Sequence, residues 1–157
     1  MLLAAAEVPL VEIPRPQEDP QRAEEAARFI VENVYRKSNP SPERLAEQLV
    51  DMRSRTTLAA FEGGMIIGTG SLEIGLPHQA RLDDIAVLDE EGYRRIGLGS
   101  RIVSRLEAMA AERRAYEITF VSAATSLGFY QKLGYVIDKS SQMCLKNLLE
   151  APALPMD

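Results

Sequence analysis

Apolar residues recur at helical spacing in four parts of the chain. Asp19-Pro20 and Ser41-Pro42 each combine a capping side chain with a proline suited to the first helical turn. The apolar positions that follow predict helices over about 20–34 and 42–52. A third helix is predicted over about 98–113, and a short fourth one over about 124–133, closed by Gly134.

Between these helices, β-rich runs predict seven strands. The sequence TTLAAFEGGMIIGTGSLEI reads as two strands joined by a tight hairpin at Gly63-Gly64. The other strands are expected near 8–15, 80–88, 116–121, 135–138 and 142–148. The resulting order β-α-α-β-β-β-α-β-α-β-β predicts one α/β (α+β) domain over 1–157, with 149–157 as a loose tail.

Composition narrows the class of protein. The balance of 18 Lys+Arg against 23 Asp+Glu gives a net charge of -5, which argues against a general nucleic-acid binder. Cys144 is the single cysteine and His78 the single histidine, so we expect no internal disulfide and no metal site. No apolar run reaches the length of about 18 residues that a membrane span needs, and the first residues lack a basic leader region. A cytoplasmic protein without a membrane partner is the simplest expectation.

The stretch EGYRRIGLGSRI, residues 91–102, joins a strand to a helix. Gly97 and Gly99 leave the first backbone N–H groups of that helix open to a ligand, and Arg94 and Arg95 add positive charge at the same end. Neither the Walker loop nor the dinucleotide fingerprint fits, since the latter would need glycine in place of Ile102. The residues alone leave a phosphate loop and an ordinary glycine-containing turn both open.

Three motifs in a suitable order carry a family resemblance. RRIGLGS, residues 94–100, matches the [Q/R]-x-x-G-x-[G/A] loop of the GNAT superfamily of N-acetyltransferases, and LGFYQKLGY, residues 127–135, resembles its FYxKxGF segment. DDIAV, residues 83–87, resembles the fourth strand of that family, and the predicted element order is similar over nearly the whole chain. The resemblance implies a mixed central sheet flanked by helices.

The resemblance also implies acetyl-CoA as cosubstrate. The pyrophosphate would be held by the loop and helix start, and the pantetheine arm would lie beside the fourth strand, where a backbone N–H of Val87 or a neighbour would face the thioester oxygen. Tyr130 would be the general acid that protonates the departing thiolate. The residues implied in cofactor binding are Ile85, Ala86, Val87, Arg94, Arg95, Ile96, Gly97, Leu98, Gly99 and Ser100.

An amine must lose a proton to react, because only about one alkyl amine in 2,500 is neutral at pH 7. Asp83, four residues before Val87, is the candidate proton acceptor. Strand alternation places Asp83 and Asp84 on opposite faces, so at most one of them should face the cleft. Glu73 is a further candidate, while solvated or substrate-orienting roles and a water chain stay open as alternatives.

The resemblance therefore implies an N-acetyltransferase that moves acetyl directly to an amine of a small molecule or protein in a ternary complex. Ala123 stands where many members have an asparagine that contacts CoA, which keeps a non-catalytic acyl-CoA-binding or regulatory module as the alternative. The loop between Val87 and Arg94 is about two residues longer than the common family spacing. Dimers are common in the family, so a homodimer is a further open alternative.

Overall fold

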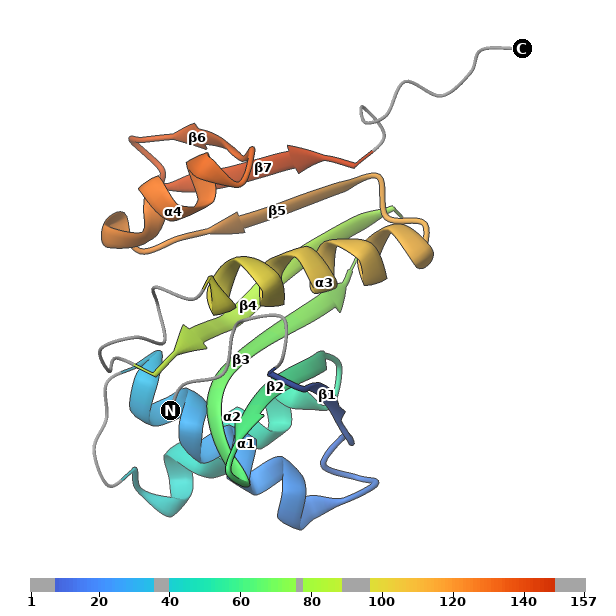
Figure 1. Cartoon of the computed structure of the whole chain (residues 1–157), viewed down its shortest axis with the longest axis vertical. Helices are drawn as coiled ribbons and strands as arrows, with labels where there is room; N and C mark the ends of the chain where they lie inside the picture. The colour runs from blue at the N-terminus through green and yellow to red at the C-terminus, as the bar shows by residue number, and fades with distance from the viewer. Residues whose placement is uncertain (1–7, 36–39, 76–77, 89–96, 149–157) are drawn as a thin grey trace.

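The computed structural model describes residues 8–35, 40–75, 78–88 and 97–148. Its element order confirms the predicted one (Figure 1). The elements are β1 (Leu10–Ile13), α1 (Pro20–Asn33), α2 (Pro42–Met52), β2 (Thr56–Glu62), β3 (Met65–Ile74), β4 (Gln79–Val87), α3 (Leu98–Glu112), β5 (Glu117–Val121), a 3₁₀ turn (Ala124–Ser126), α4 (Leu127–Lys132), β6 (Val136–Asp138) and β7 (Met143–Asn147). The expected tail, 149–157, lies outside the described residues, and the single domain over 1–157 stays a prediction.

The first two helices begin where the sequence predicts. The Asp19 side chain accepts a hydrogen bond from the Arg22 backbone N–H at 3.1 Å, and the Ser41 hydroxyl accepts one from the Arg44 N–H at 3.2 Å. Each bond satisfies one of the N–H groups that a helix start leaves unpaired. None of the helices in the described ranges combines the length and the apolar character that crossing a membrane requires.

The strands form one seven-stranded sheet in the order β1-β2-β3-β4-β5-β7-β6. Every neighbouring pair is antiparallel except β4 and β5, which run parallel. The parallel pair has only two rungs, Gln79 opposite Glu117 and Ala80 opposite Ile118. Beyond these rungs the two strands diverge, as Figure 1 shows, and this divergence creates the cleft described below.

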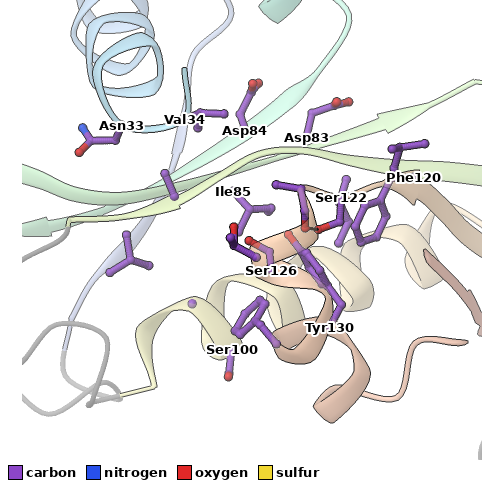
Figure 2. A pocket seen from close by; sticks show the side chains of 18 of the residues that line it. Asn33, Val34, Asp83, Asp84, Ile85, Ser100, Phe120, Ser122, Ser126 and Tyr130 are labelled. Carbon is purple, nitrogen blue, oxygen red and sulfur yellow. Dashed lines mark hydrogen bonds between the residues drawn. The ribbon is translucent and has the colours of Figure 1, made fainter. Parts of the chain in front are cut away.

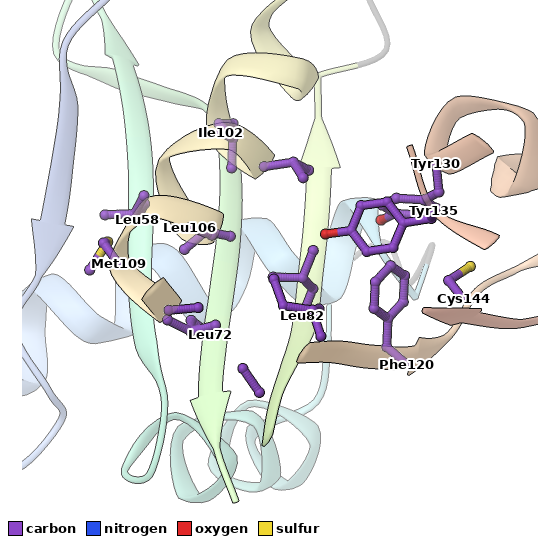
Figure 3. Packing of buried hydrophobic residues seen from close by; sticks show 14 of the residues in the cluster. Leu58, Leu72, Leu82, Ile102, Leu106, Met109, Phe120, Tyr130, Tyr135 and Cys144 are labelled. Carbon is purple, nitrogen blue, oxygen red and sulfur yellow. The ribbon is translucent and has the colours of Figure 1, made fainter. Parts of the chain in front are cut away.

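Helices cover both faces of the sheet, and strand alternation divides the buried residues between them. On β2, Leu58 and Ala60 belong to the core under α3, whereas Ala59 between them belongs to the core under α1 and α2. Figure 3 shows α3 laid over the sheet with its buried residues against those of the strands. The α3 side chains in that core include Ile102, Leu106 and Met109.

A β-bulge interrupts the ladder between β3 and β4. Thr69 pairs with Ala86 and Ser71 with Asp83, so Gly70 alone lies opposite both Asp84 and Ile85. Asp84 takes up the extra residue with φ of 57°. A bulge of this kind bends its strand and increases the local twist. It lies on the part of β4 that no longer pairs with β5.

Gly70 lets α3 approach the sheet at the bulge. A Cβ added there would lie 2.5 Å from Ile102 Cγ2 and 2.9 Å from both Ile85 Cδ1 and Leu106 Cδ1. Gly70→Ala should therefore lower the free energy of unfolding by about 1–3 kcal/mol, because α3 must shift to admit the methyl group. Urea unfolding measures this.

Gly75→Ala is the matched control, since a Cβ there meets no atom within 4 Å. We expect that change to stay within about 0.5 kcal/mol of wild type. Equal stability of the two variants would contradict close packing of α3 on β3.

Candidate active site

The divergence of β4 from β5 leaves a cleft of about 580 Å³. Its walls are residues 82–87 of β4, the start of α3, residues 120–123 at the end of β5, residues of the 3₁₀ turn and α4, and the last turn of α1 (Figure 2). Several of these segments meet here only because the sheet opens. The cleft contains most of the predicted site residues that the structure describes.

The start of α3 faces the cleft with backbone donors that have no acceptor within the helix. Gly97 is the N-cap, with a left-handed φ of 74° and no side-chain capping bond. The Arg101 N–H donates to the Gly97 carbonyl at 3.0 Å as the first bond of the helix. The N–H groups of Leu98, Gly99 and Ser100 therefore have no acceptor within the helix, and they carry the partial positive charge of its end.

Of the residues predicted to hold a phosphate, the structure brings Gly97, Gly99 and Ser100 to the cleft. Leu98 is fully buried in the core beneath the helix. Arg94, Arg95 and Ile96 lie outside the described residues, as does the long loop that precedes them.

Gly99 also sets how closely an aromatic ring approaches the helix start. A Cβ at this position would lie 3.3 Å from Phe129 Cζ and 3.6 Å from Val87 Cγ2. Since glycine has no side chain, Phe129 can pack close beside the first turn. The helix start, β4 and α4 therefore meet tightly at this end of the cleft.

The backbone of β4 offers hydrogen-bonding groups to the cleft. The Leu88 N–H donates to the Ile67 carbonyl at 2.8 Å, which makes this rung a hydrogen-bonded one. The next rung pairs Gly68 with Val87. Because bonded and non-bonded rungs alternate in an antiparallel ladder, the N–H and C=O of Val87 point away from β3 and towards the cleft. Ile85, Ala86 and Val87 all line it, as the sequence resemblance implies.

Tyr130 projects from α4 towards β4 (Figure 2). Its ring sits in an aromatic cluster, with its centroid 4.7 Å from that of Phe120, 5.0 Å from that of Phe129 and 5.7 Å from that of Tyr135. These are edge-to-face contacts, which fix a ring more firmly than burial alone. Only 6% of the residue is exposed. The cluster therefore holds the phenol in place at the cleft wall.

Burial raises the pKa of Tyr130 well above its usual value, and the negative charges that Cys144 and Asp83 can carry add to the shift. The phenol thus keeps its proton throughout the neutral range. In this form it is a hydrogen-bond donor.

The two adjacent aspartates of β4 lie on the same side of the sheet. Arg55 Nη1 is 3.0 Å from Asp84 Oδ2, and Arg55 Nε is 3.6 Å from Asp83 Oδ2. Both aspartates line the cleft. The prediction that at most one would do so is wrong, because the bulge adds a residue directly after Asp83 and turns Asp84 to the same side.

The aspartates differ in their surroundings. The Asp83 side chain is 24% exposed and accepts a hydrogen bond from Arg81 Nε at 2.8 Å. The Asp84 side chain is 1% exposed, and burial raises its pKa against the opposing effect of Arg55. Glu73, the other candidate acid, pairs with Arg81 and accepts from the Ser54 hydroxyl at 2.9 Å, and it does not line this cleft.

Of His78, Cys144 and Ala123, only Ala123 lines the cleft. His78 is exposed in the turn before β4 and stacks on Tyr116 with centroids 3.9 Å apart, away from the cleft. Cys144 is buried in β7, and Ala123 lines the cleft. Within the ranges that the structure describes, no three His, Cys, Asp or Glu side chains gather as metal ligands would.

The raised pKa of Tyr130 predicts a stability loss in alkali. In the unfolded chain the phenol loses its proton above about pH 10, whereas in the folded protein it keeps it, so rising pH favours the unfolded state. From pH 10 to pH 11 this group should lower the free energy of unfolding by about 1 kcal/mol. Denaturant unfolding of wild type and Tyr130→Phe at both pH values measures this. Between the two pH values, the free energy of unfolding should fall by about 1 kcal/mol less in Tyr130→Phe than in wild type. Equal losses in the two proteins would contradict a buried phenol.

Comparison with known proteins identifies the family. The model of the acetyltransferase (GNAT) family matches residues 19–135. YyaT, an uncharacterized protein of Bacillus subtilis (strain 168), is 39% identical over 77 residues, which are 49% of this chain and 50% of YyaT. The chain spans about half the length of the curated relatives it matches.

Solved structures share the fold at low sequence identity. A GNAT-family acetyltransferase from Staphylococcus aureus Mu50 has a TM-score of 0.70 and 16% identity, over 90% of this chain and 99% of that one. The aminoglycoside 6'-N-acetyltransferase of Enterococcus faecium has a TM-score of 0.68 and 16% identity, over 92% of this chain and 99% of that one. Since the family match spans well over half of the chain, this protein belongs to the acetyltransferase (GNAT) family.

Proposed function

We propose that this protein transfers acetyl from acetyl-CoA directly to an amine of a small molecule or protein in a ternary complex. The observation that carries the proposal is the cleft between β4 and β5, which has the uncapped start of α3 at one end and the Tyr130 phenol on its wall. We also propose a cytoplasmic location, in keeping with the single cysteine of the chain.

The residues present fit this cosubstrate. The N–H groups of Leu98, Gly99 and Ser100, which have no acceptor within the helix, are suited to a pyrophosphate, which needs several donors and positive potential. The free edge of β4 at residues 85–87 is suited to the amide-containing pantetheine arm, which can pair with a strand backbone. Arg94 and Arg95 remain predicted contacts of the same pyrophosphate.

Acetyl-CoA supplies a thioester, whose carbonyl carbon bonds to the amine nitrogen while the sulfur leaves with its electron pair. The Val87 N–H is proposed to donate to the carbonyl oxygen as negative charge develops there, which is worth most in a site closed to water. Tyr130 is proposed to donate its phenolic proton to the sulfur. Burial raises the pKa of the phenol, but the same surroundings disfavour a thiolate as well, so the cost of the transfer depends on the difference between the two groups.

Asp83 is proposed to accept the amine proton, directly or through water. Deprotonating an alkyl ammonium at pH 7 costs about 4.6 kcal/mol, so an acceptor in the cleft is useful. Of the two aspartates that line the cleft, Asp83 is the one that solvent reaches, with its side chain 24% exposed against 1% for Asp84. Solvent contact allows the proton to pass on to bulk water between turnovers.

Gly99→Val tests the anion site. The added side chain would meet Phe129 and cover the donors at the start of α3, so the affinity for CoA measured by calorimetry should fall at least about tenfold. Ala111→Val, at an exposed position near the other end of α3, is the control and should bind CoA as wild type does. Wild-type protein that binds no CoA at high concentration would refute the proposal.

Tyr130→Phe tests the proton donor. Thiol release from acetyl-CoA, measured over a panel of amines, should fall by about 10²-fold in kcat/KM, because only the proton-donating hydroxyl is removed. CoA affinity should change less than about twofold.

Tyr135→Phe is a matched control. This second buried tyrosine donates its hydroxyl hydrogen bond to Glu107 at 2.8 Å rather than to the cleft, so its loss should affect stability and leave kcat unchanged. Equal loss of activity in the two variants would contradict a specific role for Tyr130. Wild-type protein that binds CoA and turns over no amine would favour the binding or regulatory module instead.

A further inference from the structure

We propose that Asp84 is a positioning residue for acetyl transfer: it holds the bulge of β4 and thereby keeps the Val87 N–H directed into the cleft. The inference rests on the proposed function of the cleft. It assigns Asp84 a role distinct from that of its neighbour Asp83, although the two side chains share Arg55.

Asp84 has a backbone conformation that needs support. Its φ of 57° lies in the left-handed region, which is costly for a residue with a side chain and unusual within a strand. Aspartate and asparagine tolerate it better than other residues with a Cβ. The Thr69 hydroxyl of β3 donates to the Asp84 carbonyl at 2.9 Å and helps to fix the peptide at the bulge.

The Asp84 side chain is held from outside the sheet. Its Oδ2 accepts from Arg55 Nη1 at 3.0 Å and from Gln48 Nε2 at 3.3 Å. Gln48 comes from α2 and is fully buried, and Arg55 lies in the short link between α2 and β2. The bulge is therefore tied to a different layer of the fold as well as to the neighbouring strand.

A purely stabilising role fits this arrangement poorly. A buried ion pair contributes little net stability unless its remaining polar atoms are satisfied. Here Asp84 Oδ1 and Gln48 Oε1 are buried without a hydrogen-bond partner among the described residues. Because these two acceptors are unpaired, the contacts among Asp84, Arg55 and Gln48 are better explained by the strand geometry that they impose at the bulge than by a gain in stability.

That geometry extends to the cleft. With the bulge, Gly68 is opposite Val87, whose N–H points into the cleft. Without the bulge, the pairing of Ser71 with Asp83 would continue in register and place Gly68 opposite Ala86. A slip of one residue reverses the direction of every following group, so the Val87 N–H would then point at β3.

Three substitutions separate the backbone conformation, the side-chain bonds and the charge. Asp84→Asn tolerates the left-handed conformation and offers an oxygen to both donors. Asp84→Gly tolerates the conformation and lacks the bonds, and Asp84→Ala lacks both. We expect kcat to fall at least about tenfold in the Ala and Gly variants and to stay within about threefold in the Asn variant. CoA affinity by calorimetry should change less than about twofold in the Asn variant and should fall in the Ala and Gly variants, because the proposed pairing of the pantetheine arm with residues 85–87 depends on the same register.

Leu72→Ala is the control for a general loss of stability. Leu72 is buried in β3 and does not line the cleft, so this variant should lower Tm and keep kcat at 25 °C. An Asn variant as inactive as the Ala variant would overturn the proposal and indicate that the charge or proton of Asp84 takes part directly. An Ala or Gly variant with wild-type kcat would overturn it as well.

If the wild-type protein acetylates no amine, the proposed function fails independently of the role of Asp84. Amide hydrogen exchange over residues 79–88 then still tests whether Asp84 stabilises the bulge of β4, because this measurement needs no substrate. Exchange should be faster in the Ala and Gly variants than in wild type and unchanged in the Asn variant. Equal exchange in all four proteins would show that Asp84 does not hold the strand.

Discussion

The structure depends on the pairing of β4 with β5 over only two rungs. Each strand keeps a full antiparallel partner on its other side, β3 for β4 and β7 for β5, so both remain part of the sheet while their facing edges separate. The closed end is fixed by the turn before β4, where the His78 carbonyl accepts from the N–H groups of Tyr116 at 2.6 Å and Glu117 at 3.3 Å. The open end then has backbone groups available to a ligand, which an unbroken sheet could not offer.

Helix α3 brings the backbone donors of its first turn to that open end. Its buried face packs across β3 and β4, and Gly70 avoids a side chain that would hold the helix away from the sheet. This packing fixes where the helix begins, and the left-handed Gly97 turns the chain into its first residue without covering the free N–H groups. The position of the donors is therefore a result of core packing.

Much of this could be predicted from the sequence, because the signals are local. Asp19 and Ser41 predicted the starts of two helices. Through a family pattern, Gly97, Gly99 and Tyr130 predicted one end and part of the wall of the cleft. The face of the sheet on which the Asp84 side chain lies could not be predicted. A bulge adds one residue to the strand without a recognisable sequence signal, and it reverses the alternation of side chains between the two faces. The hydrogen bonds of Gln48 and Arg55 to Asp84 could not be predicted either, because these residues lie 36 and 29 positions away from it in the sequence.

Asp83 and Asp84 carry identical side chains, but they differ in burial and therefore in the chemistry open to them. Asp83 pairs with Arg81 near the surface and is partly reached by solvent, so a proton it accepts has a way out to water. Asp84 is enclosed by Gln48 and Arg55 with its side chain 1% exposed, so a proton arriving there would have no comparable path to water. The difference in exposure therefore supports Asp83 rather than Asp84 as the proposed proton acceptor. The bulge thus gives two adjacent aspartates different depths on the same face, which is what the roles proposed for Asp83 and Asp84 require.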